Sequence, residues 1–252
     1  MAFVRNIPEP TISRIPIYLR CFRTAQLKGI DTLSSADLEA ISGIKSCIIR
    51  RDFSCFGLLG KPGLGYFVSD MLKFFNNIMH TQAEQRVMLV GAGNLGTALA
   101  GYSGMLTAGF NLAAIYDNNF SKIGRKMWDL EILDIEKMPV VNMHMQIRIG
   151  LITTPAEAAQ SVAKKMITSG VTAIVNFVPA RIDVPKHVTV RNVDLAQELQ
   201  ITSYYLHVNE QHTEQVAASG NIAVPSYQGW KKNRRSGIAN NERPFCIQGA
   251  DI

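Results

Sequence analysis

The stretch VMLVGAGNLG, residues 87–96, decides the fold of the middle of this chain. Its first four residues are apolar and predict a buried strand, its glycines have the spacing G-x-G-x-x-G, and helix-forming residues follow. A strand, this turn and a helix in succession are typical of dinucleotide-binding domains. Gly91 would allow the tight turn, Gly93 the approach of a pyrophosphate to the backbone, and Gly96 close packing between helix and strand. A purely structural glycine turn is the alternative.

An acidic residue supports the dinucleotide interpretation. A second apolar strand over 112–116 ends at Asp117, 21 residues beyond Gly96, close to the usual place of a ribose-binding carboxylate. A carboxylate there favours NAD(H) over NADP(H), because it would repel a 2′-phosphate. We therefore expect NADH and NAD⁺ to be ligands of this domain.

Strands and helices continue to alternate after this motif. Apolar runs predict strands at 147–153, 173–175 and 188–193, and a helix at 156–169. Parallel strands with intervening helices predict an α/β fold with a doubly wound Rossmann-type sheet. The stretch 124–146 has no clean period and receives no assignment.

The first 82 residues predict helices instead. A capping signal, Ser34 followed by Asp37, starts a second helix, and residues 46–56 form a third. Helices joined by short turns with glycine are the helix-turn-helix arrangement. In the first helix, apolar residues recur at helical spacing, at Ile12, Ile15, Leu19 and Phe22.

The third helix has two unlike faces. At about 100° per residue, one face carries the apolar residues Ile49, Phe53 and Phe56. The opposite face carries Arg50, Arg51 and Ser54. Arginine makes bidentate contacts with guanine edges and with phosphates, so this face is a candidate DNA-binding surface.

A glycine-rich segment follows this helix. The sequence GLLGKPGLGY, residues 57–66, has four glycines and a proline, which excludes a helix and favours a tight hairpin with Lys61 near its tip. Glycines let a backbone approach a surface closely, and Lys61 would supply charge to a phosphate. An ordinary glycine-rich turn is the alternative, but after a two-arginine helix the hairpin looks like the wing of a winged helix.

The composition describes a globular protein. Of 252 residues, 47% are hydrophobic and 18% are charged, and four arginines interrupt the first 30 residues. No apolar run approaches the roughly 18 residues of a membrane span, so neither a span nor a secretory signal is expected. The four cysteines form no C-x-x-C pair. We therefore expect a reduced, cytoplasmic protein without a metal site.

The net charge of +6 is unevenly spread. Residues 1–82 hold 10 Lys and Arg against 6 Asp and Glu, residues 83–212 hold 11 of each, and residues 213–252 hold 5 against 3. We expect a winged-helix DNA-binding domain over 1–82, a Rossmann domain over 83–197, a terminal helix over 198–212 and a disordered tail over 213–252. The terminal helix is apolar on more than one side, which suggests packing on its own core or an arm swapped in a dimer.

The order of these elements resembles one family, the redox-sensing transcriptional repressors called Rex. The resemblance runs from about residue 7 to residue 212, over four fifths of the chain. Residues 125–148 match the family poorly. The motifs that carry the resemblance follow in the family's order: SRIPIYLR at 13–20, IRRDFS at 49–54, GKPGLGY at 60–66, GAGNLGT at 91–97, SKIG at 121–124, PAEAAQ at 155–160, NFVPA at 176–180 and DLAQELQ at 194–200.

This resemblance implies a homodimeric repressor that senses the ratio of NADH to NAD⁺. It would bind operator DNA when NADH is scarce and release it when NADH binds. The residues implied to contact DNA are Arg50, Arg51, Ser54 and Lys61. The residues implied for the dinucleotide site are Gly91, Ala92, Gly93, Asn94, Leu95, Gly96, Asp117, Lys122, Ile123, Thr154 and Pro155. The family's interdomain switch, in which one carboxylate exchanges an arginine for a tyrosine partner, is matched by Arg20, Tyr102 and Asp194.

Two other function classes stay open. A Rossmann-domain dehydrogenase needs an acid–base group beside the nicotinamide, but the histidines show no such pattern and residues 1–82 leave no room for a substrate domain. We therefore expect no catalytic residues. A CoA- or nucleotide-binding interaction module would share the glycine turn without requiring Asp117.

Overall fold

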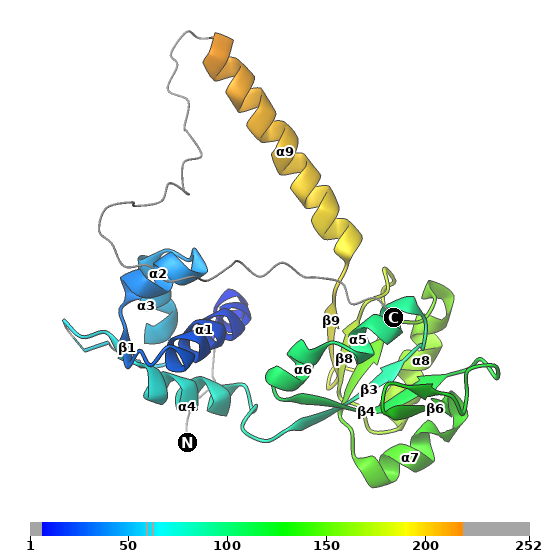
Figure 1. Cartoon of the computed structure of the whole chain (residues 1–252). Helices are drawn as coiled ribbons and strands as arrows, with labels where there is room; N and C mark the ends of the chain where they lie inside the picture. Colours follow the sequence, from blue (N-terminus) through cyan, green and yellow to red (C-terminus); the bar gives the residue numbers. More distant parts are fainter. Residues whose placement is uncertain (1–6, 59, 62, 219–252) are drawn as a thin grey trace, which may run out of the picture. The chain divides into compact units, whose positions relative to one another are not determined.

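The computed structural model describes residues 7–58, 60–61 and 63–218 (Figure 1). The capping box expected at the second helix is present, since Ser34 and Asp37 each accept a hydrogen bond from the other's backbone N–H. Gly43, in the left-handed conformation at φ 72°, ends that helix. The first part of the chain consists of α1 (Glu9–Leu27), β1 (Thr32–Leu33), α2 (Ser35–Ser42), α3 (Ser46–Ser54), β2 (Tyr66–Phe67) and α4 (Val68–Ile78).

The glycine-rich segment forms the expected hairpin. Lys61 and Gly65 exchange two backbone hydrogen bonds of 2.9 Å, which close a tight turn. Beyond the turn, Tyr66 pairs antiparallel with Leu33 of β1, a strand that the sequence pattern did not predict. At Gly65 φ is +87° and a Cβ would lie 2.5 Å from the Leu33 carbonyl oxygen, so only glycine fits. A helix-turn-helix followed by this hairpin makes a winged-helix domain.

The buried face of α1 differs from the expected one at its first turn. Ile15 and Leu19 are buried as the spacing predicts, but Ile12 is 43% exposed. Thr11 is buried in its place and donates a 2.8 Å hydrogen bond to the buried Asp52. The face is displaced because a buried carboxylate needs donors, and Thr11 is one.

The second domain contains, among the residues that the structure describes, a seven-stranded sheet in the order β5-β6-β4-β3-β7-β8-β9. Its neighbouring strands are parallel except for the β5–β6 hairpin. The order reverses between β3 and β7, and ligands of such sheets bind at the carboxyl ends of the strands at this point. The strands are β3 (Gln85–Val90), β4 (Phe110–Asp117), β5 (Lys126–Met127), β6 (Leu130–Asp134), β7 (Ile149–Ile152), β8 (Ala173–Asn176) and β9 (Thr189–Asn192).

Helices cover both faces of this sheet, because alternate residues of a strand point to opposite sides. Met88 and Val90 pack in one hydrophobic cluster with α7 and α8, whereas Val87 and Leu89 pack in another with α5 and α6. The fold is the doubly wound Rossmann-type sheet that the sequence predicts. The helices are α5 (Asn94–Ala100), α6 (Ser103–Thr107), α7 (Met138–Met145) and α8 (Ala156–Thr168).

The stretch that the sequence left unassigned contains short elements. β5 and β6 form a hairpin, and a 3-10 helix, η1 (Ile135–Lys137), leads into α7. Trp128 occupies the hairpin turn with φ 55°, a conformation uncommon outside glycine. β5 and η1 have two and three residues, fewer than a periodicity needs to be recognised.

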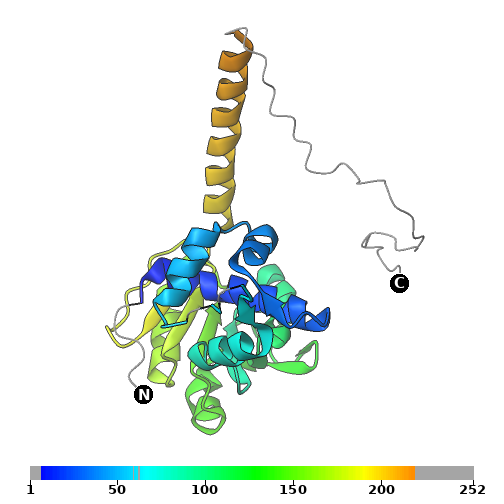
Figure 2. The ribbon, with the colours of Figure 1, turned by 90° about the vertical axis from the view of Figure 1, so that its left-hand side faces the viewer.

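The C-terminal helix α9 (Leu195–Ala218) is one unbroken helix in both views (Figures 1 and 2). It begins before the expected residue 198 and continues past residue 212, and the chain divides into two compact units after Asp194. The helix extends because residues 213–218 include Glu, Gln and Ala, and no glycine occurs between Leu195 and Gly220. The remainder of the expected tail, 219–252, lies outside the described residues. Within the described ranges, no helix combines the length and hydropathy that crossing a membrane requires.

Candidate nucleotide site and DNA-binding surface

Three glycines shape the turn between β3 and α5, each in a different way. Gly91 has φ +110°, and a Cβ there would lie 2.7 Å from the Thr153 backbone. A Cβ on Gly96 would lie 2.0 Å from the Gly91 carbonyl oxygen, so helix and turn touch at this point. A Cβ on Gly93, in contrast, would meet no atom within 4 Å. The fold does not itself require glycine at 93, and the open space beside it suits a ligand phosphate.

Asp117 is 7% exposed and lies at the end of β4, next to this turn. Its Oδ2 accepts hydrogen bonds from the Ala92 N–H at 2.8 Å and from Lys122 Nζ at 3.2 Å. Its Oδ1 accepts a 2.9 Å hydrogen bond from the Asn119 N–H. Burial would raise the pKa of Asp117, but the hydrogen bonds and the Lys122 charge bring this pKa below its usual value. The ionised carboxylate therefore ties the glycine turn to the neighbouring strand.

A cavity of about 610 Å³ opens in front of the turn, within the size range of small-molecule sites. It is lined by residues from the carboxyl ends of β3, β4 and β7. Thr154, which follows β7, lines this cavity, and its buried Oγ1 has no hydrogen-bond partner among the described residues. A buried hydroxyl without a partner is costly unless a ligand or water completes it. The site therefore fits a polar ligand that brings a further hydrogen-bonding group.

Most of the expected dinucleotide residues meet at this cavity. Those that line it are Gly91, Gly93, Asp117, Lys122, Thr154 and Pro155. The others lie beside the lining: Ala92 within the turn, Asn94, Leu95 and Gly96 in the first turn of α5, and Ile123 in the loop after β4. The fold thus brings together side chains and backbone from three separate segments.

The cavity wall also contains residues that the sequence analysis missed. Glu136 of η1 and Lys165 of α8 line it and form an ion pair with each other. They stand 29 residues apart, and neither belongs to a motif, so no pattern in the sequence pointed to them. In the described ranges, no group of three His, Cys, Asp or Glu side chains could hold a metal ion.

α3 has the two faces that its sequence predicts. The residues expected to be buried are buried, namely Ile49 and Phe53 of α3 and Phe56 just beyond its end, whereas Ile48 is 37% exposed. The residues of the expected DNA-binding face are exposed, namely Arg50, Arg51 and Ser54. The Ser54 hydroxyl donates to the carbonyl oxygen of Arg51 at 2.7 Å, so its proton is engaged within the helix, while both guanidiniums face solvent.

A groove of about 520 Å³ is lined by both α3 and the wing hairpin. Arg50 and Lys61 border this groove, and so does Ser35 at the start of α2. Arg50 Nη1 donates a 3.0 Å hydrogen bond to Ser35 Oγ, and Lys61 Nζ lies 4.7 Å from the centre of the Phe67 ring. Two cations from separate segments therefore face one groove, whose lining also includes Asp37, and the two cations suit a polyanion.

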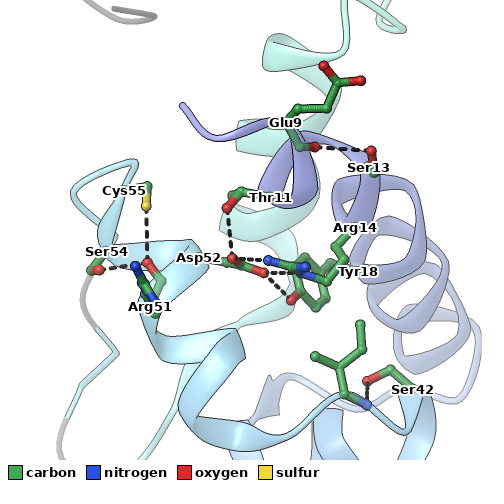
Figure 3. Close-up of polar contacts among 11 residues, drawn as sticks. Glu9, Thr11, Ser13, Arg14, Tyr18, Ser42, Arg51, Asp52, Ser54 and Cys55 are labelled. Atoms are coloured by element: carbon green, nitrogen blue, oxygen red, sulfur yellow. Dashed lines mark hydrogen bonds and ion pairs between the residues drawn. The ribbon is translucent and has the colours of Figure 1, made fainter. Parts of the chain in front are cut away.

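Asp52 of α3 is 2% exposed and lies against α1. Its carboxylate accepts hydrogen bonds from Thr11, Arg14 and Tyr18 of α1 (Figure 3). Sequence reasoning singled out its neighbours Arg50 and Arg51 but assigned Asp52 no role. A charged residue inside an apolar helix face was the signal that could have found it, because such a charge requires a partner.

The three residues of the expected switch lie at the ends or on the surfaces of their elements. Arg20 is exposed on α1, and Tyr102 is exposed at the N-cap of α6. Asp194 is partly exposed and directly precedes α9. Their exchange of partners stays a prediction.

Known families match both halves of this chain. The family described as "Putative DNA-binding protein N-terminus" matches residues 6–54, and the family described as "CoA binding domain" matches residues 82–180. A protein of Pelotomaculum thermopropionicum named redox-sensing transcriptional repressor Rex is 40% identical over 201 residues, 80% of this chain and 94% of its own length. A protein of the same name from Streptomyces coelicolor is 36% identical over 236 residues, 94% of this chain and 90% of its own length.

Solved structures are similar over the same range. RSP, described as a Rex-family repressor, in complex with β-NADH aligns with a TM-score of 0.74 at 30% identity, over 84% of this chain and 100% of that one. RSP in complex with β-NAD⁺ and operator DNA aligns with a TM-score of 0.77 at 31% identity, over 87% of this chain and 100% of that one.

Proposed function

Because this chain belongs to the Rex family of redox-sensing transcriptional repressors, we propose that it represses transcription from operator DNA and is released from that DNA when NADH binds. One observation carries the proposal: a single chain presents two exposed arginines on a winged-helix α3 and a dinucleotide-sized cavity on a Rossmann sheet. The chain acts as a cytoplasmic regulator and not as an enzyme. NADH and NAD⁺ are regulatory ligands, so no bond of either ligand has to be made or broken.

The dinucleotide binds across the carboxyl ends of β3, β4 and β7. Its pyrophosphate lies against Gly93 at the N-terminus of α5, where free backbone N–H groups and the helix dipole favour an anion. Its adenine ribose lies near Asp117 and Lys122, and Thr154 supplies a hydroxyl at the end of β7. The unpartnered Thr154 hydroxyl and the open space at Gly93 support this placement.

DNA binds to the surface formed by α3 and the wing. Arg50 and Arg51 reach base edges or phosphates, and Lys61 contacts the backbone; the Ser54 hydroxyl joins this contact by rotating from the Arg51 carbonyl to a phosphate. Operator release requires that NADH has a different affinity for the DNA-bound and released conformations. The proposed coupling is an exchange at the Asp194 carboxylate between Arg20 and Tyr102.

A mobility shift with the DNA upstream of the protein's own gene tests this function. NADH, NAD⁺ and CoA are added separately over a concentration range at constant salt. We expect NADH to release the DNA at a lower concentration than NAD⁺, and CoA to have no effect. Release by CoA alone would favour the interaction-module class, whose glycine turn matches the family described as "CoA binding domain".

We further propose that the functional unit is a homodimer in which α9 is swapped. Along α9, large apolar side chains are exposed in the single chain, including Leu199 at 71% and Tyr204 at 66%. A helix that exposes such a surface needs a partner, and exchange of identical arms is a low-cost route to a dimer.

Truncation tests the dimer. A chain that ends at Asp194 should become monomeric or aggregate, measured by light scattering after size exclusion. The control, a chain that ends at residue 218, retains all of α9 and should stay dimeric. A soluble dimer from the shorter chain would contradict the swapped-helix proposal.

A further inference from the structure

We propose that Asp52 is the positioning residue of the DNA-binding domain: by binding three side chains of α1, it sets how α3 presents Arg50 and Arg51 to DNA. The inference rests on the DNA-binding function proposed above. It gives a role to a buried charge of α3 whose carboxylate is bound by α1 (Figure 3).

The contacts of Asp52 saturate both carboxylate oxygens. Oδ1 accepts from Thr11 Oγ1 at 2.8 Å and from Arg14 Nη2 at 2.7 Å. Oδ2 accepts from Arg14 Nε at 2.6 Å and from the Tyr18 hydroxyl at 2.6 Å. Thr11, Arg14 and Tyr18 follow one another at helical spacing on α1, so their donors converge on a single point. A carboxylate bound from both edges has little freedom to rotate or slide. Because Asp52 belongs to α3, the same contacts restrict the movement of α3 relative to α1.

The protonation states reinforce this geometry. Burial alone would raise the pKa of Asp52, but hydrogen bonds from Arg14, Tyr18 and Thr11 bring this pKa below its usual value. Burial and the Asp52 carboxylate raise the pKa of Tyr18, so its hydroxyl stays a donor. The network is therefore complete at neutral pH.

The pairing also leaves the arginines of α3 available. Arg14 supplies the cation that Asp52 needs and is only 27% exposed. In the described part of the chain, the ion pairs include neither Arg50 nor Arg51. Both guanidiniums can therefore bind an external anion without first leaving an internal carboxylate.

A positioning role follows from the energetics of buried ion pairs. The cost of removing two charges from water offsets most of their attraction, so such a pair adds little net stability, whereas its geometry is strict. Recognition of a base edge tolerates displacements of only about 0.5 Å, but attraction to phosphates tolerates much more. Loosening the network should therefore reduce operator preference more than affinity for DNA in general.

The main test uses Asp52→Asn in the full-length protein, which keeps the side-chain shape and removes the charge. The measurement is affinity for operator DNA and for an unrelated duplex of the same length, at the same salt. We expect the ratio of the two affinities to fall about tenfold or more, out of the roughly 10³-fold or larger preference typical of specific binding. Affinity for NADH should not change. The matched control, Asp70→Asn, removes the same charge from an exposed position on α4 and should preserve the ratio.

A second variant keeps the test decisive if Asp52→Asn does not fold. Tyr18→Phe removes one donor and retains the ring, which packs edge-to-face on Phe53 at 5.0 Å. We expect a smaller fall in the same ratio. The proposal is overturned, and Asp52 is only structural, if both variants fold with a lower melting temperature but the ratio of operator to unrelated-duplex affinity is unchanged. The same conclusion follows if only Tyr18→Phe folds and this ratio is unchanged. If the wild-type protein itself shows no preference for operator DNA over the unrelated duplex, the DNA-binding function is refuted instead.

Discussion

Each domain contains a buried aspartate, Asp52 within α3 and Asp117 at the end of β4, and their surroundings differ. Asp52 is 2% exposed, and both of its carboxylate oxygens are occupied by side chains of α1. Asp117 borders a cavity of about 610 Å³ and binds two backbone N–H groups and one lysine. Both have a pKa below the usual value, but Asp52 completes an internal structure whereas Asp117 forms the edge of an open site.

We therefore interpret Asp52 as part of a rigid DNA-binding surface and Asp117 as part of a site that senses a ligand. In the described part of the DNA-binding domain, every buried side-chain N or O has a hydrogen-bond partner, and we expect its arginines to be held in one arrangement. The nucleotide domain retains an unpartnered hydroxyl at Thr154 and empty space at Gly93, so it is completed by a ligand. Changes in one domain should therefore alter one binding activity and leave the other intact.

Gly93→Ala is expected to separate the two binding activities most strongly, by lowering NADH affinity and leaving DNA affinity unchanged. An added methyl meets nothing within the protein but occupies the place of the pyrophosphate. A forced contact of this kind costs on the order of 1–3 kcal/mol, so NADH affinity should fall up to about 100-fold. Titration calorimetry and a mobility shift across rising NADH measure the effect. The melting temperature and DNA binding without nucleotide should match wild type, and release at the wild-type NADH concentration would contradict the site.

Arg51→Ala should produce the converse result. Loss of a bidentate contact costs about 2 kcal/mol, or about 30-fold in operator affinity, and NADH affinity should be unchanged. The control is Lys73→Ala, which removes one exposed charge from α4 of the same domain and should have a smaller effect. Equal losses from both variants would show that only total charge matters.

Asp117→Asn should weaken the nucleotide site moderately. The amide retains the shape but loses the charge that Lys122 and the Ala92 N–H stabilise. We expect NADH affinity to fall about tenfold, the scale of one lost hydrogen bond to a charged group, and NADPH to compete better. Fluorescence titration with each nucleotide measures both. Unchanged discrimination between NADH and NADPH would show that Asp117 only supports the glycine turn.

The smallest effect is a shared dependence of stability on pH. The folded-state pKa of each aspartate lies below the unfolded value of about 3.9. Their stabilisation is therefore complete above that value and is lost as the pH falls through the folded-state pKa. Urea unfolding between pH 7 and pH 3 should show this loss, with a shallower decline in Asp52→Asn and in Asp117→Asn. If the free energy of unfolding falls with pH equally in wild type and both variants, the two aspartates do not cause the pH dependence.

Local features of the fold could be predicted because each depends on a few neighbouring residues. The capping box at Ser34, the two faces of α3 and the separate tasks of Gly91 and Gly96 follow from backbone geometry within one turn. The short hairpin before α7 could not, because β5 is stabilised by pairing with β6, and β6 by pairing with both β5 and β4, and not by a pattern of their own.

The sequence by itself determined the winged-helix and Rossmann order, the glycine turn and the exposed arginines, since periodicity and turn chemistry are local properties. Only the tertiary structure decided which distant side chains meet. Asp52 meets Arg14 across 38 residues, and Lys165 meets Glu136 across 29. Such pairs depend on how helices pack. The sequence does not indicate whether a charged side chain will be surrounded by water or by a partner.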